Sequence, residues 1–222
     1  MEHDANPHRD SWIVPSHACL RTRWRNGLGW TREIAQGRLR SAGDEASDAT
    51  QGSTADEGWD WRLSVAEIDG EAPFSRFDGV EREQMLLSGN GLRLRRAAGE
   101  TVLHPPHDRL RFTGEEVMVG CPLDGRVEVV NLMWRRARVD AASWHRPLVG
   151  PMVIFVEPGS TWLIHLIGGQ GMFTDGAGPG GLEAGDTAVL AAGRTRLRHV
   201  LEGGGEAWVI RLCRAEATGR TE

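Results

Sequence analysis

An arginine and a serine stand two residues apart in a stretch that alternates polar and apolar side chains. Arg62 and Ser64 share one face of a predicted strand, and the large apolar residues between 61 and 65 share the other. If the polar face lines a cavity, the Arg62 guanidinium needs a carboxylate there, from the protein or from a ligand. The alternatives are that this face points to solvent, or that Arg62 pairs with an acidic residue such as Glu33 and only stabilises the fold.

A second arginine, Arg82, follows a turn rich in phenylalanine. Its planar guanidinium can bind a carboxylate through two parallel hydrogen bonds, which suits small organic acids. The alternative is a salt bridge to Glu81, Glu83 or Glu33. Arg62 and Arg82 are therefore the candidate anchors for an anionic ligand. For each of them, a salt bridge within the protein remains the alternative.

Four other polar residues complete the candidate ligand-binding site. Asn26, Thr31 and Glu33 flank the loop 26–29, whose glycines let the backbone approach a ligand or simply turn the chain. Asn131 lies within an otherwise apolar predicted strand, where its amide must find a hydrogen-bond partner. That partner can be neighbouring backbone or a ligand.

Composition removes several kinds of catalysis. All 26 basic residues are arginine, and the chain contains no tyrosine. Schiff-base chemistry, lysine-anchored pyridoxal phosphate and a phosphate-binding loop lysine are excluded, as is a phenolic acid or base. Any acid–base catalysis would have to use His, Asp, Glu or Cys. We predict no catalytic residues and leave open whether the protein is an enzyme.

Charge, hydropathy and cysteine count limit which partners the protein can have and in which cellular compartment we expect it. The net charge of -5 argues against a general nucleic-acid partner, and no apolar run reaches membrane-spanning length. The N-terminus carries no signal-peptide pattern, and the three cysteines are far apart. We expect a cytoplasmic protein with no nucleic-acid or membrane partner.

Short alternating runs separated by glycine, proline and aspartate predict an all-β protein. Residues 41–58 are small and acidic, which predicts an exposed insertion, and residues 1–11 and 215–222 are expected to be frayed termini. Gly99 precedes Pro105 by six positions, and Gly185 precedes Ala191 by the same spacing. This weak internal repeat suggests two similar barrels in one chain.

A series of motifs in the first half resembles the HutD/Ves family. The match spans roughly residues 12–136 in order and is more diffuse beyond. Its motifs are W-R-N-G at 24–27, T-R-E-I at 31–34, W-R-L-S-V-A at 61–66, F-S-R-F-D-G at 74–79 with Arg82 following, L-L-S-G-N-G at 86–91 and N-L-M-W-R-R at 131–136. The sequence departs from the family pattern at Leu28, Asp78 and Val129, which puts the identity of the ligand in doubt.

The resemblance implies a bicupin, meaning two cupin-like (RmlC-type) β-barrels in one chain. We expect the first barrel at 12–149 and the second at 150–214, packed on the first. Cupins that bind metal use an HxH pair, a glutamate and a further histidine. The corresponding positions of this chain are Met85 and Leu87 in the first barrel, and His165, Ile167 and Arg196 in the second. We therefore predict no metal and no cofactor.

The resemblance also implies regulation of histidine utilisation, or of a stress response in the Ves branch. We predict a metal-free protein that binds a small carboxylate metabolite such as urocanate or a formylglutamate-like acid, with a homodimer possible. One alternative is a metal-independent cupin isomerase or hydrolase, in which Glu33 or a histidine would be the general base. The other is a structural partner protein whose barrels are filled by side chains.

Overall fold

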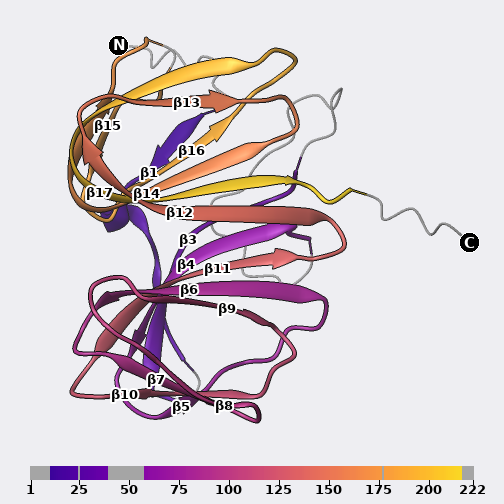
Figure 1. Ribbon diagram of the computed structural model, residues 1–222, viewed down its shortest axis with the longest axis vertical. Coiled ribbons are helices and arrows are strands. Elements are labelled where there is room, and N and C mark those ends of the chain that lie inside the picture. The colour runs from indigo at the N-terminus through magenta and orange to yellow at the C-terminus, as the bar shows by residue number, and fades with distance from the viewer. Residues whose placement is uncertain (1–10, 25, 40–57, 177, 217–222) are drawn as a thin grey trace, which may run out of the picture. The chain divides into compact units, whose positions relative to one another are not determined.

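The computed structural model describes residues 11–24, 26–39, 58–176 and 178–216 (Figure 1). Apart from the short 3-10 helix η1 (Ser16–Ala18), the regular elements in these residues are β-strands. The all-β prediction is confirmed. No helix in the described part of the chain is long and apolar enough to span a membrane. The predicted acidic insertion and frayed termini lie outside the described residues, except for Ser11, Gly58, Ala215 and Glu216.

The chain forms two compact units. Among the described residues, unit 1 contains those within 1–18, 39–47 and 141–214, and unit 2 contains those within 19–38, 48–140 and 215–222. This division differs from the expected ranges 12–149 and 150–214 at both ends of the first range. The difference arises because the N-terminal strand and most of strand β12 pair within the sheet of unit 1.

Unit 2 contains two antiparallel sheets. The six-stranded sheet has the order β2-β3-β4-β11-β6-β9, and the four-stranded sheet has the order β5-β10-β7-β8. The strands of the larger sheet are β2 (Arg21–Arg23), β3 (Gly29–Gly37), β4 (Trp61–Ile68), β6 (Val80–Ser88), β9 (Arg109–Thr113) and β11 (Val127–Arg135). Those of the smaller sheet are β5 (Ala72–Pro73), β7 (Leu92–Arg96), β8 (Gly99–Leu103) and β10 (Met118–Pro122).

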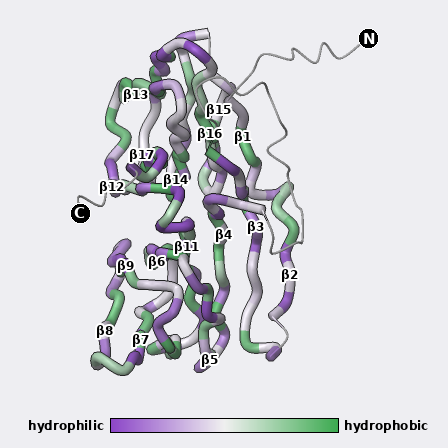
Figure 2. The backbone as a smooth tube through the Cα atoms, turned by 90° about the vertical axis from the view of Figure 1, so that its right-hand side faces the viewer, coloured by the Kyte–Doolittle hydropathy of each residue, from purple (hydrophilic) through white to green (hydrophobic). Residues whose placement is uncertain are grey.

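A shared apolar core joins the two sheets of unit 2. Ala66 and Val129 of the larger sheet belong to one buried cluster with Leu94 and Met118 of the smaller sheet. Figure 2 shows hydrophobic and hydrophilic residues interspersed along these strands. In the central strands β4 and β11 nearly every residue is buried, so both faces of the larger sheet are covered there. The residues that pack with the smaller sheet lie on one of these two faces. The face of the larger sheet that carries Ala66 and Val129 is therefore its inner face.

Unit 1 is built on one seven-stranded sheet. Strands follow the order β1-β16-β14-β17-β12, with β13 paired to β17 and β15 paired to β14. Their bounds are β1 (Trp12–Val14), β12 (Val139–Val149), β13 (Met152–Val156), β14 (Thr161–Phe173), β15 (Gly181–Glu183), β16 (Thr187–Ala191) and β17 (Leu197–Arg214). Its buried cluster is aliphatic except for Phe173.

The expectation of two closed β-barrels is not confirmed. The strand order of each sheet ends in two edge strands, so the sheet does not close on itself. These edge strands are β1 and β12 in the sheet of unit 1, β2 and β9 in the larger sheet of unit 2, and β5 and β8 in its smaller sheet. In unit 2 the two sheets meet through side chains of the shared core rather than through backbone hydrogen bonds. The observed architecture is a set of open antiparallel sheets that enclose apolar cores.

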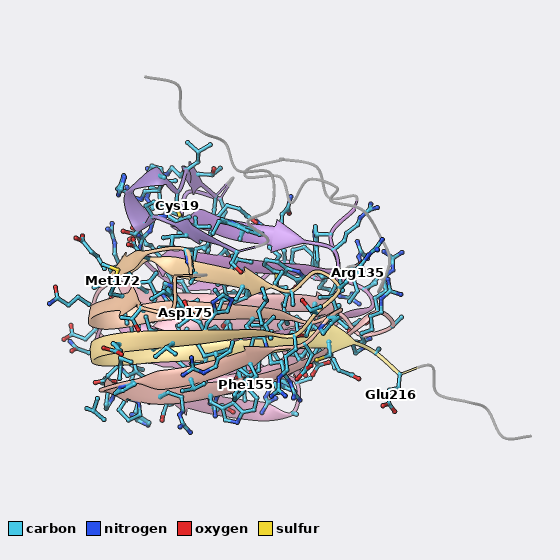
Figure 3. The ribbon with its side chains drawn as sticks, turned by 90° about the horizontal axis from the view of Figure 1, so that it is seen from above. Cys19, Arg135, Phe155, Met172, Asp175 and Glu216 are labelled. Atoms are coloured by element: carbon cyan, nitrogen blue, oxygen red, sulfur yellow. The ribbon has the colours of Figure 1, made fainter. Side chains whose placement is uncertain are left out.

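A buried histidine lies in unit 1. His199 of β17 has no exposed side-chain surface, and its Nδ1 lies 3.3 Å from Oδ2 of Asp175, which Figure 3 labels. The ring packs edge-on against Phe173 with centroids 5.9 Å apart. Burial lowers the pKa of His199, and this effect exceeds the opposing attraction of the Asp175 carboxylate. The imidazole is therefore neutral in the folded protein at neutral pH.

We expect the protein to lose stability as the pH falls from about 7.5 to 5.5. The unfolded state takes up a proton on His199 near pH 6.5, whereas the folded state takes it up only at lower pH. The stabilisation is complete above about pH 6.5 and declines below it, at up to about 1.4 kcal/mol per pH unit. Urea unfolding at pH 7.5, 6.5 and 5.5 measures this. His199→Gln should flatten the profile, and an unchanged slope in that variant would contradict the assignment.

Candidate functional site

A row of polar side chains crosses the inner face of the six-stranded sheet in unit 2. In the strand register Glu33 lies opposite Ser64, Ser64 opposite Asn131, and Asn131 opposite Gln84. One rung along, Met133 lies between Arg62 and Arg82. Since side chains alternate along strands, these residues share the face that carries Ala66 and Val129. We call the six residues Glu33, Arg62, Ser64, Arg82, Gln84 and Asn131 the polar row.

Arg62 forms an ion pair with Glu33. Its Nε donates to both carboxylate oxygens, at 2.7 and 2.8 Å, and its Nη2 also contacts Oε2. About a quarter of each side chain is exposed. The structural alternative stated for Arg62 is therefore present in the molecule. The pair brings one positive and one negative charge into the row, so Arg62 is already neutralised.

Arg82 is buried, with 7% of its surface exposed, and it has no carboxylate partner among the described residues. Its Nη2 donates to Oδ1 of Asn131 and its Nη1 to the backbone oxygen of Ser75, both at 3.2 Å. Its Nε is buried without a hydrogen-bond partner. The three carboxylates considered as partners contact other arginines: Glu33 contacts Arg62, Glu81 contacts Arg136, and Glu83 contacts Arg109 and Arg111.

Three phenylalanine rings surround the guanidinium of Arg82. Its central carbon lies 5.6 Å from the ring centroid of Phe74, 5.7 Å from that of Phe77 and 5.0 Å from that of Phe112. Burial, together with the smaller effect of the positive charge of Arg62, lowers the pKa of Arg82 to about 10. The side chain remains charged at neutral pH. The rings attract this charge weakly, but they do not neutralise it.

Asn131 and Gln84 form a hydrogen-bonded group with Arg82 at one end of the row. Asn131 Oδ1 accepts from Arg82 and also from Nε2 of Gln84, at 3.3 Å. Gln84 is 2% exposed, and its Oε1 is buried without a partner. The row therefore offers an unused donor at Arg82 Nε and an unused acceptor at Gln84. Buried polar atoms of this kind normally find a hydrogen-bond partner.

Two of the predicted site residues have local structural roles. Asn26 Oδ1 accepts from the backbone nitrogen of Leu28 at 3.0 Å, which closes the loop before β3. Thr31 Oγ1 accepts from Nε1 of Trp24 at 2.8 Å, and Thr31 lies opposite Ala66 in the register rather than in the polar row. Of the seven predicted residues, the structure brings five together, which are Glu33, Arg62, Ser64, Arg82 and Asn131.

Sequence reasoning missed Gln84 and the phenylalanine rings. Gln84 carried a usable signal, because it stands two residues after Arg82 and so shares its strand face. Phe112 carried none, since only the pairing of β6 with β9 places it opposite Arg82.

The chemistry available in the polar row is anion binding. Guanidinium and amide groups donate hydrogen bonds to a carboxylate, and burial strengthens those bonds. The row holds one carboxylate, Glu33, and neither histidine nor cysteine, so it is not a set of metal ligands. In unit 1, His165 Nδ1 lies 2.9 Å from Thr187 Oγ1, and Arg196 forms an ion pair with Glu157 at 2.9 Å.

Two curated relatives match part of the chain. An uncharacterised 21.2 kDa protein in the hutC 3' region of Pseudomonas putida is 33% identical over 119 residues, which are 53% of this chain and 55% of that protein. Protein Ves of Citrobacter koseri is 34% identical over 119 residues, which are 53% of this chain and 54% of that protein. The chain thus spans about half the length of the curated relatives it matches.

Solved structures match nearly the whole chain. A conserved protein of unknown function from Pseudomonas aeruginosa PAO1 aligns with a TM-score of 0.76 and 24% identity, over 93% of this chain and 100% of that one. HutD from Pseudomonas fluorescens SBW25, determined in a formate condition, aligns with a TM-score of 0.74 and 22% identity over the same shares. At these identities the likeness concerns the fold alone, which is all-β.

The family profile described as HutD matches residues 16–209. This range includes every residue of the polar row. It also includes the motifs at 24–27, 61–66 and 131–136. The resemblance seen in the sequence is confirmed, and the chain belongs to the HutD family.

Proposed function

We propose that this protein binds a small carboxylate in unit 2, without a metal, and that Arg82 is the principal anion anchor. The observation that carries the proposal is a buried guanidinium with no carboxylate partner among the described residues. A buried charge is costly unless it is paired and hydrogen-bonded. A ligand carboxylate supplies both the opposite charge and acceptors for the guanidinium.

The other members of the polar row define the remaining contacts. Arg62 is a second, weaker anchor because Glu33 already neutralises it. Gln84 Oε1 faces no donor, so a ligand with an N–H or O–H group near its carboxylate would satisfy it. Ser64 and Asn131 lie opposite each other in the rung next to the one that holds the two arginines. Urocanate and formylglutamate-like acids meet these requirements.

The assignment to unit 2 rests on its buried arginine, because the buried polar side chains among the described residues of unit 1 include His165 and His199 but no arginine. The buried cluster of unit 1 consists of apolar side chains that pack against one another. The inner face of the larger sheet in unit 2 combines an apolar core with the polar row. We propose that the two units are the halves of a bicupin and that unit 2 holds the carboxylate site.

We further propose that binding regulates histidine utilisation. The support is membership of the HutD family and the likeness to a protein in the hutC 3' region of Pseudomonas putida. A regulator needs reversible binding of a metabolite and no catalytic group. The polar row fits this role, because its one carboxylate is held by Arg62.

Thermal-shift titration of the wild-type protein tests the proposal. Formate, acetate, urocanate and formylglutamate are compared with formamide and acetamide, which match two of the acids in size but carry no charge. A carboxylate present at about 100 times its dissociation constant should stabilise the protein by about 2.7 kcal/mol, a shift of several degrees. Equal effects of acids and amides, or no effect of any acid, would overturn the proposal.

A further inference from the structure

Three arginines line a pocket in unit 2 that shares no residue with the polar row. The pocket has a volume of about 500 Å3 and is lined by Arg38, Gly58, Arg135 and Arg138. Arg38 follows the end of β3, Gly58 precedes β4, and Arg135 ends β11. Figure 3 labels Arg135. The volume lies within the range of small-molecule sites, which extends from about 300 to 1,000 Å3.

Backbone carbonyl groups fix two of these guanidinium groups. Arg38 Nε donates to the oxygen of Gly58, and Arg135 Nε donates to the oxygen of Trp59 at 2.9 Å. The guanidinium of Arg135 also lies over the Trp59 ring, 5.0 Å from its centroid. Because each contact uses Nε, the terminal amino groups remain available. In the described part of the chain they make no hydrogen bond or ion pair.

The pocket carries an excess of positive charge. Arg138 Nη1 pairs with Oδ1 of Asp60 at 3.0 Å, and no carboxylate is among the lining residues. Arg38 and Arg135 have no carboxylate partner within the described residues. Counted over the residues that the structure describes, two guanidinium charges therefore have no counter-charge. This balance matches a dianion better than a monoanion.

Gly58 permits the arrangement. Its φ of +133° is rarely adopted by other residues, and a Cβ at this position would lie 2.8 Å from Nη2 of Arg38. Any side chain here would both strain the backbone and displace the guanidinium. The sequence thus places a glycine where Arg38 must lie against the chain.

We propose that this pocket binds the dianionic phosphate group of a phosphorylated small molecule. Arg38 and Arg135 hold the phosphate oxygens through their terminal amino groups, and Arg138 supports them from its ion pair with Asp60. The space beyond the guanidinium groups accommodates the organic part of a phosphate monoester. The site is independent of the carboxylate site, so one can be lost while the other is retained.

The test uses isothermal titration of the full chain at constant ionic strength. The probes are inorganic phosphate, glycerol 3-phosphate and adenosine monophosphate, with chloride as the reference ion. We expect the monoesters to bind more tightly than inorganic phosphate, and Arg38→Gln and Arg135→Gln each to weaken binding at least tenfold. Gly58→Ala should weaken it as well. Tighter binding of inorganic phosphate would leave a simple anion site and overturn the proposal of a phosphorylated ligand.

Two controls keep the outcome specific. Arg93→Gln removes an exposed arginine that forms an ion pair with Glu100, at 3.7 Å, and should leave phosphate binding unchanged. Arg82→Met should also leave it unchanged, which separates this site from the carboxylate site. Equal weakening by Arg93→Gln would show nonspecific attraction to net charge and overturn the proposal. So would tighter binding of a short single-stranded oligonucleotide than of the monoesters.

Discussion

Gly205→Ala is expected to destabilise the protein by more than about 3 kcal/mol, or to abolish soluble expression. In unit 1, β14 and β17 are long paired strands, and Gly169 lies opposite Gly205 in their register. The φ of Gly205 is +136°, and a Cβ there would lie 2.0 Å from the backbone oxygen of Gly168. That oxygen belongs to the neighbouring strand, so the clash cannot be relieved by a side-chain rotation. Relief requires separating two strands at the centre of the sheet.

The neighbouring residue provides a matched control for this prediction. Gly204 pairs with Gln170 in the same strand pair, and a Cβ at Gly204 would meet no atom within 4 Å. Gly204→Ala should change the free energy of unfolding by less than about 1 kcal/mol. Urea unfolding followed by circular dichroism compares the two variants. Similar destabilisation by both would show that chain flexibility, rather than the close approach of the strands, makes glycine necessary.

The strand pattern of the chain could be predicted from local sequence, and its closure into sheets could not. Alternation over 61–68 placed Arg62 and Ser64 on one face, and β4 (Trp61–Ile68) has that arrangement. In contrast, β1 pairs with β16, more than 170 residues away, as in the pair Trp12 and Val189. Pairing over such distances depends on the whole core, and no short-range pattern encodes it. The expectation of two barrels, which came from the family resemblance and a weak repeat, is not confirmed by the strand orders.

The candidate site shows a similar division between local and non-local information. Arg62 and Arg82 each had two interpretations in the sequence, an ion pair or a ligand contact. The structure distinguishes them, because Glu33 lies beside Arg62 while Arg82 faces Phe74, Phe77 and Phe112. The pairing of β3 with β4 and of β6 with β9 determines these neighbours. The residue types suggested an anion site, and the register shows that Arg62 has a carboxylate partner whereas Arg82 has none among the described residues.

Arg82→Met is expected to weaken carboxylate binding by at least about 30-fold, since losing one partner of a buried charge pair costs about 2–5 kcal/mol. Methionine keeps much of the apolar length of the side chain among the phenylalanine rings. Without ligand, the variant should be as stable as the wild type or more so, because it removes a buried charge that has no carboxylate partner among the described residues. Asn131 Oδ1 still accepts from Gln84, so one of its hydrogen bonds remains.

Arg62→Met is the matched control for Arg82→Met, because both arginines lie on one face and in one rung of the sheet. Removing Arg62 leaves the Glu33 carboxylate without its ion-pair partner, which repels an anionic ligand. The expected weakening is about tenfold or less, since both groups are partly exposed and solvent screens their charges. Titration calorimetry with the strongest carboxylate of the series measures both variants, and urea unfolding measures their stability without ligand. A larger loss of binding in Arg62→Met than in Arg82→Met would assign the anion to the Glu33–Arg62 end of the row. The buried guanidinium of Arg82 would then be a structural charge, stabilised by Asn131, the Ser75 carbonyl and the three aromatic rings alone.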